Sequence, residues 1–260
     1  MRSLSPALSR TTPPTTSPTT PAAGAPARRR RRRTALLGAA VTAAFVAGLM
    51  APASASAESN GGLRIMPLGD SITAGSNIAG AYRNRLWERA AADKRLVDFV
   101  GTQYHGPTSL PDRDNEGHSG FRIDQIDAQV VDWAKRANPR TVLLHIGTND
   151  MTQNYDLAGA PARLSALIDH LTAAAPNADV FVASIIPFTN PGVEARGKAY
   201  NAAIPGIVNQ WAQKGRRVHF VDMHSALTAA DLADGVHPTA TGYAKMADRW
   251  YTTLRTGPWI

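Results

Sequence analysis

The chain has 260 residues, with 28 Lys and Arg against 20 Asp and Glu, so its formal net charge is +8. Eight of the arginines precede the first acidic residue, Glu58, and the rest of the chain carries 20 basic and 20 acidic residues. A formally neutral remainder removes the main argument for nucleic acid as a partner. The absence of cysteine excludes a disulfide scaffold, a thiol nucleophile and a cysteine-ligated zinc site.

Residues 1–57 have the pattern of an export signal. Six arginines at 28–33 precede an apolar stretch at 35–50, which is followed by alternating small residues. This order is typical of a signal peptide, so we expect cleavage after Ala55 or Ala57, secretion by the general or the twin-arginine route, and no stable membrane association afterwards. A retained membrane anchor is the alternative, which the short, Ala-rich apolar stretch and the proline after it disfavour.

The remainder, residues 58–260, alternates short β-type runs with amphipathic helical patterns, and we expect it to form one domain. Its first β-type run contains Pro67, which cannot donate to a sheet ladder and is predicted to lie at the C-terminal end of the strand. All five runs are rich in Val, Ile, Leu or Phe, as in strands that are covered on both faces. The predicted strands are 64–68, 97–101, 141–146, 179–185 and 217–221.

Four helical patterns lie between or after these strands. The clearest has apolar residues at three- and four-residue steps from Ile123 to Ala137 and stops at Asn138-Pro139. The other three include residues 164–171, 193–214 and 243–254. Strand–helix alternation with right-handed crossovers predicts a mostly parallel sheet in a three-layer α/β/α sandwich. The segment 102–122 is rich in Gly, Pro, Asp and Ser and is predicted to be a loop.

Four polar segments fall where a parallel sheet would bring them to one edge. They are Gly69-Asp70-Ser71, Asn115-Glu116-Gly117-His118-Ser119-Gly120, Gly147-Thr148-Asn149-Asp150 and Asp234-Gly235-Val236-His237-Pro238. In this order they resemble the sequence blocks of the SGNH, or GDSL, hydrolase superfamily. The resemblance implies a flavodoxin-like sheet of about five parallel strands, which agrees with the hydrophobic pattern.

The resemblance also implies a role for individual residues. Ser71 would be the nucleophile, His237 its general base, and Asp234 the carboxylate that orients the imidazole. The backbone N–H groups of Ser71 and Gly120 and the side-chain amide of Asn149 would form an oxyanion hole. Neither a cofactor nor a metal ion is expected.

Two of these assignments have competitors. Gly117 could replace Gly120, since both lack a Cβ and let the backbone approach a substrate. Asp150, Asp234 and His237 could form a metal site, although no ligand-spacing motif supports one. The segment with Asp234 and His237 could also be a turn that caps the last helix.

Other polar residues are expected to be structural. We assign Asp70 and Asp150 to loop organisation and helix capping, and His118 to local hydrogen bonding. His145 lies inside an apolar strand and is predicted to be a core histidine with a satisfied hydrogen bond.

The sequences of two segments, Met66 to Thr73 and Asn115 to Arg122, are similar to those of the third carbohydrate-esterase family, which includes acetyl xylan esterases. Members of that family often carry Trp or Tyr where this chain has Phe121. The resemblance implies a secreted, monomeric acetylesterase that acts on an acylated carbohydrate such as acetylxylan, or on a small ester. The alternatives are a lipase, lysophospholipase or thioesterase of the same superfamily, and a non-catalytic carbohydrate-binding protein.

Overall fold

The computed structural model describes residues 60–256, so the export signal predicted at 1–57 lies outside the described residues. Five strands pair in parallel in the order β2-β1-β5-β6-β7. This order confirms the predicted flavodoxin-like sheet. The strands are β1 (Leu63–Gly69), β2 (Val97–Phe99), β5 (Thr141–His145), β6 (Asp179–Ala183) and β7 (Val218–Val221).

The segment predicted to be a loop contains two further strands, β3 (Gln103–Tyr104) and β4 (Asp114–Gly117). β3 pairs antiparallel with β4, and β4 pairs in parallel with the last two residues of β1. The prediction was wrong here because the four residues of β4, Asp-Asn-Glu-Gly, include none of the β-branched or aromatic types that favour strands. The pairing brings the residues that follow β4 next to those that follow β1.

Pro67 lies inside β1 rather than at its end. Backbone groups of Leu63, Ile65 and Gly69 bond on the edge of β1 that faces β2 and β4. Alternation along the strand places the Pro67 nitrogen on the same edge. β2 pairs with the first half of β1, and β4 pairs with its end. The N–H that Pro67 lacks would therefore lie between the part of β1 that pairs with β2 and the part that pairs with β4. A proline is tolerated there because no ladder bond is lost.

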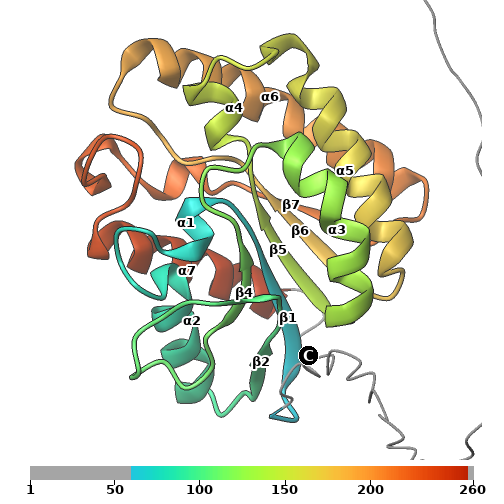
Figure 1. Cartoon of the computed structure of the whole chain (residues 1–260), viewed down its shortest axis with the longest axis vertical. Helices are drawn as coiled ribbons and strands as arrows, with labels where there is room; N and C mark the ends of the chain where they lie inside the picture. Colours follow the sequence, from blue (N-terminus) through green and yellow to red (C-terminus); the bar gives the residue numbers. More distant parts are fainter. Residues whose placement is uncertain (1–59, 257–260) are drawn as a thin grey trace, which may run out of the picture. The chain divides into compact units, whose positions relative to one another are not determined.

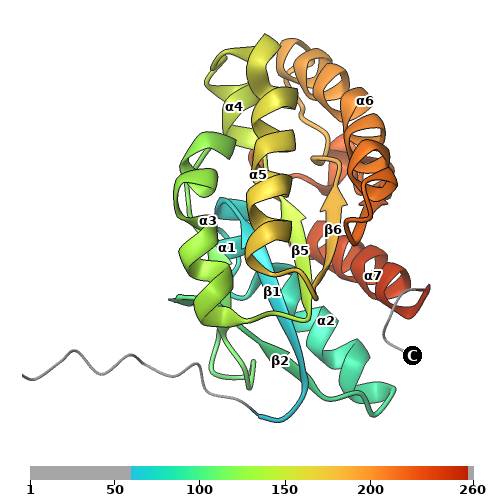
Figure 2. The same cartoon turned by 90° about the vertical axis from the view of Figure 1, so that its right-hand side faces the viewer.

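Helices cover both faces of the sheet (Figures 1 and 2), which confirms the three-layer prediction. The four predicted helices are present, but α2 was not predicted, because its buried face includes a charged residue, Arg83. On one face lie α2 (Ala81–Ala92) and α7 (Ala240–Thr256), and on the other α3 (Ile123–Ala137), α5 (Ala160–Ala174) and α6 (Pro191–Gln213).

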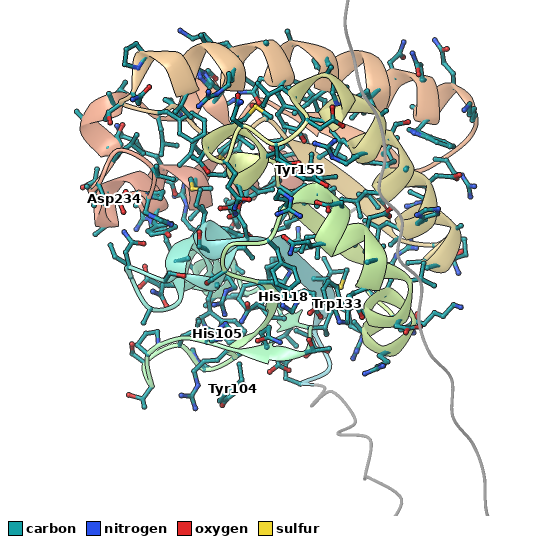
Figure 3. The ribbon with its side chains drawn as sticks, turned by 45° about the horizontal axis from the view of Figure 1, so that its top comes forward. Tyr104, His105, His118, Trp133, Tyr155 and Asp234 are labelled. Carbon is teal, nitrogen blue, oxygen red and sulfur yellow. The ribbon has the colours of Figure 1, made fainter. Side chains whose placement is uncertain are left out.

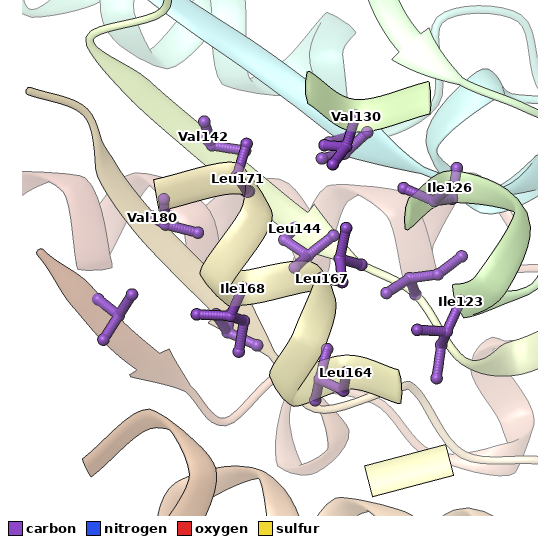
Figure 4. Close-up of a cluster of buried hydrophobic side chains, with 14 of the residues drawn as sticks. Ile123, Ile126, Val130, Val142, Leu144, Leu164, Leu167, Ile168, Leu171 and Val180 are labelled. Carbon is purple, nitrogen blue, oxygen red and sulfur yellow. The ribbon is translucent and has the colours of Figure 1, made fainter. Parts of the chain in front are cut away.

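Successive strand residues enter two separate cores. Ile65 of β1 packs in the core beside α2 and α7, whereas Met66 packs in the core beside α3, α5 and α6. Figure 4 shows part of this second core, in which apolar side chains of α3 and α5 meet those of β5 and β6. Such two-sided packing holds the strand ends in fixed positions.

Two short helices, α1 (Ser71–Ala74) and α4 (Thr148–Thr152), begin just after β1 and β5. Because parallel strands end at the same edge of a sheet, both helices lie where a site is expected in this fold. Among residues 60–256, every helix is too short or too polar to span a membrane. Single turns of 3-10 helix occur at Leu157–Gly159, His224–Ala226 and Ala229–Asp231.

Candidate active site

Ser71 is positioned by the turn from β1 into α1. The Asp70 carboxylate accepts a backbone N–H of α1 at 2.9 Å and so caps this helix. Gly69 is required before it, since an added Cβ would lie 2.3 Å from the backbone oxygen of His145. Ser71 is 8% exposed, and its Oγ lies 2.9 Å from Nε2 of His237.

His237 contacts Ser71 with one ring nitrogen and Asp234 with the other. Its Nδ1 lies 2.8 Å from Oδ2 of Asp234, which Figure 3 shows on the loop before α7. Asp234 Oδ1 accepts the backbone N–H groups of His237 at 2.7 Å and Val236 at 3.0 Å. Desolvation opposes ionisation, but these hydrogen bonds outweigh it and lower the pKa of Asp234 to about 2. The ionised carboxylate accepts Nδ1–H, so the lone pair of Nε2 faces the serine hydroxyl.

Each of the three groups predicted to form the oxyanion hole keeps an N–H that no described residue accepts. Within residues 60–256, the backbone N–H groups of Ser71 and Gly120 donate to no other group. Asn149 of α4 donates one side-chain N–H to the carbonyl oxygen of Phe121 at 2.9 Å. An amide nitrogen carries two protons, so a second donor is available while the first fixes the side chain.

The geometry favours Gly120 over Gly117 as the second backbone donor. The N–H of Gly117 already donates to Asn115 Oδ1 at 3.0 Å. A Cβ on Gly117 would lie 2.4 Å from the backbone nitrogen of Ala74, so this glycine is needed for close packing of β4 against α1. Gly120 has a φ of +82° and open space where a Cβ would stand, as a donor that faces a substrate requires.

The two buried aspartates hold backbone segments in place. Burial raises the pKa of Asp70 to about 6, although a backbone N–H and the Thr148 hydroxyl act to lower this pKa. Asp150 accepts the N–H of Ile123 at the start of α3 at 3.0 Å and Arg163 at 2.9 Å. Among residues 60–256, no three His, Cys, Asp or Glu side chains form a group that could hold a metal ion.

His145 departs from the prediction of a satisfied core histidine. It is fully buried at the end of β5, but neither ring nitrogen has a hydrogen-bond partner among the described residues. Burial lowers the pKa of His145 to about 4, so the ring is neutral at pH 7. An apolar strand pattern predicts burial of a side chain, but it contains no information about polar partners.

Asn77 supports the His237 loop, and the sequence analysis did not identify it. Its Nδ2 donates to the carbonyl oxygen of Pro238 at 2.8 Å, and its Oδ1 accepts the hydroxyl of Tyr243 at 3.0 Å. Both partners are more than 160 residues away along the chain. No local spacing in the sequence could reveal these contacts.

Comparisons with known proteins agree with this geometry. The GDSL-like Lipase/Acylhydrolase family matches residues 68–245. A multidomain esterase of Ruminococcus flavefaciens is 34% identical over an alignment that covers 73% of this chain and 28% of that relative. A solved family 3 carbohydrate esterase of Clostridium thermocellum is 39% identical, with a TM-score of 0.68 over 75% of this chain and 96% of that one. A solved carbohydrate esterase family 3 protein of Talaromyces cellulolyticus is 29% identical, with a TM-score of 0.66 over 75% and 97%.

The chain spans only about a quarter of the length of the multidomain relative, but nearly all of each of these two solved structures. The family match covers all of the segments that carry the candidate site. The chain therefore belongs to the GDSL-like lipase/acylhydrolase family, and it is a serine ester hydrolase.

Proposed function

We propose that the protein is a secreted acetylesterase that removes acetyl groups from a polysaccharide such as acetylated xylan. The observation that carries this proposal is the 39% identity to a family 3 carbohydrate esterase over almost the whole of that structure. The polar composition of the site supports it. None of the large hydrophobic side chains exposed in residues 60–256 belongs to the four segments that carry the candidate site residues. A long acyl chain would need an apolar surface there.

In the proposed mechanism, Ser71 Oγ attacks the carbonyl carbon of the ester while His237 Nε2 takes the hydroxyl proton. Asp234 stabilises the resulting imidazolium through Nδ1. The N–H groups of Ser71 and Gly120 and the amide of Asn149 stabilise the oxyanion of the tetrahedral intermediate. His237 then returns the proton to the sugar oxygen as the C–O bond breaks. A water molecule hydrolyses the acyl-serine by the same steps, and acetate leaves.

The substrate assignment is tested by measuring the release of acetate from acetylated xylan. Hydrolysis of p-nitrophenyl acetate and p-nitrophenyl octanoate is measured in parallel. We expect acetate from the polymer and faster cleavage of the acetyl than of the octanoyl ester, with both activities lost in Ser71→Ala. Faster cleavage of the octanoyl ester without acetate release would contradict the proposal in favour of a lipase or thioesterase. Absence of hydrolysis in every assay would favour a carbohydrate-binding protein.

Secretion rests on the sequence pattern of residues 1–57. Expression of the full chain in a bacterial host, followed by N-terminal sequencing of the protein in the medium, tests it. We expect the mature chain to begin at Ser56 or Glu58. Retention of the uncleaved chain in the membrane fraction would support the anchor alternative instead.

A further inference from the structure

The segment His118 to Phe121 forms a tight turn that contributes to the oxyanion hole twice. His118 donates its backbone N–H to the oxygen of Gly69, two residues before Ser71, at 2.9 Å, and Phe121 donates to the oxygen of His118 at 3.1 Å. Gly120 stands third in this turn, where a positive φ is required. The turn therefore presents the Gly120 N–H, while the carbonyl of Phe121, its last residue, holds Asn149.

The imidazole of His118 is held at its edge by a buried carboxylate. Its Nε2 lies 2.5 Å from Oε1 of Glu116, which is fully buried. Glu116 also accepts the backbone N–H of Thr102 at 2.8 Å and its hydroxyl at 2.6 Å. Three donors thus fix the carboxylate, and the carboxylate in turn fixes the histidine.

The imidazole of His118 stacks on two aromatic rings. The ring of Trp133, on α3, lies 4.2 Å from it at an interplanar angle of 7°, and Figure 3 shows the two side by side. The ring of Phe121 lies 5.0 Å away at 23°. The first and last residues of the turn are therefore stacked on each other, and the stack rests on a helix of the core.

We propose that His118 is a positioning residue for the oxyanion hole. Glu116 and Trp133 lock its imidazole, and the imidazole fixes the turn that presents the Gly120 N–H and orients the Asn149 amide. Histidine suits this position because its flat ring stacks on aromatic side chains and its ring N–H donates to a buried carboxylate. The inference rests on the proposed function, because it assumes that these donors act on the oxyanion.

His118→Phe tests it, since phenylalanine keeps the flat ring and removes the donor. We expect kcat for p-nitrophenyl acetate to fall about tenfold or more, because a displacement well under 1 Å weakens oriented donors, while KM changes by less than about twofold. Glu116→Gln keeps the size of its partner and removes the charge. We expect a smaller loss of kcat, with KM again unchanged, and this variant also serves if His118→Phe does not fold.

A double-mutant cycle with Asn149→Ala separates positioning from a general structural effect. We expect His118→Phe, or Glu116→Gln in its place, to cost clearly less in the Asn149→Ala background than in the wild type, because part of what the turn orients is already gone. Equal losses in the two backgrounds, or a loss expressed in KM, would overturn the inference. If Ser71→Ala remains active, the proposed function itself fails, whereas an inactive Ser71→Ala with additive His118 effects overturns only the positioning role.

His219 offers a matched control. Its Nε2 lies 2.9 Å from Oδ1 of the buried Asp179, and its ring stacks on Phe181 at 4.8 Å and 27°. The histidine, carboxylate and aromatic ring meet in a similar way, although Asp179 also pairs with Arg217, and Asp179 begins β6 at the end of the strand away from the candidate site. We expect His219→Phe to change kcat by less than about twofold. A loss as large as that of His118→Phe would show that kcat responds to any such stack.

Discussion

Ser71 and His237 are 166 residues apart in the chain, and yet Ser71 Oγ lies 2.9 Å from His237 Nε2. Ser71 follows the second strand of the parallel sheet in spatial order, and His237 lies on the loop that follows the last strand. The contact exists because parallel strands end at the same edge, and because Asn77 joins the loop after α1 to Pro238. The fold thus brings an imidazole nitrogen within hydrogen-bonding distance of a serine hydroxyl, which is the pair that the proposed mechanism uses as base and nucleophile.

Asp234→Asn is expected to lower kcat by about 10²-fold. The asparagine oxygen can still accept the two backbone N–H bonds that shape the loop. Its amide no longer favours the tautomer with a proton on Nδ1, which costs about 10⁴-fold in a fully buried triad. The effect should be smaller here because the Asp234 side chain is 56% exposed, so water can partly replace the carboxylate. Steady-state kinetics on p-nitrophenyl acetate measure it, and an unchanged kcat would contradict the assigned role.

Asp222→Asn is the control for that substitution. Its carboxylate also accepts a backbone N–H three residues ahead, from Ser225 at 3.1 Å, but it contacts neither Ser71 nor His237. We expect wild-type kcat from this variant.

Asn149→Ala should lower kcat by about 10²- to 10³-fold with little change in KM, because the lost donor acts on charge that develops only in the transition state. Thr152→Ala, on the exposed side of the same helix, is the control and should keep wild-type kcat. A loss confined to KM would show that Asn149 binds the ground state and does not stabilise the oxyanion.

Alanine at the two glycines should have different effects. Gly120→Ala adds a methyl group in open space, so the protein should fold at a cost of about 1 kcal/mol for the positive φ and lose turnover as the N–H shifts. Gly117→Ala places a Cβ 2.4 Å from the Ala74 backbone and should lower the melting temperature strongly. Thermal unfolding and kcat of both variants test this, and a stable, fully active Gly120→Ala would argue against the donor role.

His145→Leu should change how stability depends on pH. Burial lowers the pKa of His145 to about 4, below the unfolded value of about 6.5, so the unfolded chain binds more protons between these values. Wild-type stability from this group is therefore lost as the pH falls below about 6.5, by about 2 kcal/mol at pH 5. Leucine does not titrate, so its contribution to stability does not change with pH. Denaturant unfolding at pH 7 and pH 5 should show a smaller acid loss in the variant, and equal losses would contradict the buried neutral state.

The sequence predicts the elements that follow a simple hydrophobic period. Five parallel strands and the helices α3, α5, α6 and α7 are of this kind, and all are present. The polar strand β4 and the helix α2, whose buried face includes Arg83, lack such a period and were missed. Ser71, Gly120 and Asn149 each lie shortly after a strand, whereas Asp234 and His237 lie on the loop between β7 and α7. Their roles in catalysis stay predictions.

The contacts that orient these residues could not be predicted. The stack of His118 on Trp133 and the bond from Asn77 to Pro238 join side chains from different elements. Their geometry depends on the tertiary packing and leaves no periodic pattern in either segment. The partners of His145 were predicted wrongly for the same reason.

Covalent labelling of the protein with a fluorophosphonate, followed by peptide mapping, tests the central claim most directly. We expect one adduct, on Ser71, formed in step with the loss of esterase activity. The adduct should be absent from Ser71→Ala and form far more slowly in His237→Ala, while both variants keep the wild-type melting temperature. An adduct on another residue, or normal turnover by Ser71→Ala, would contradict the account.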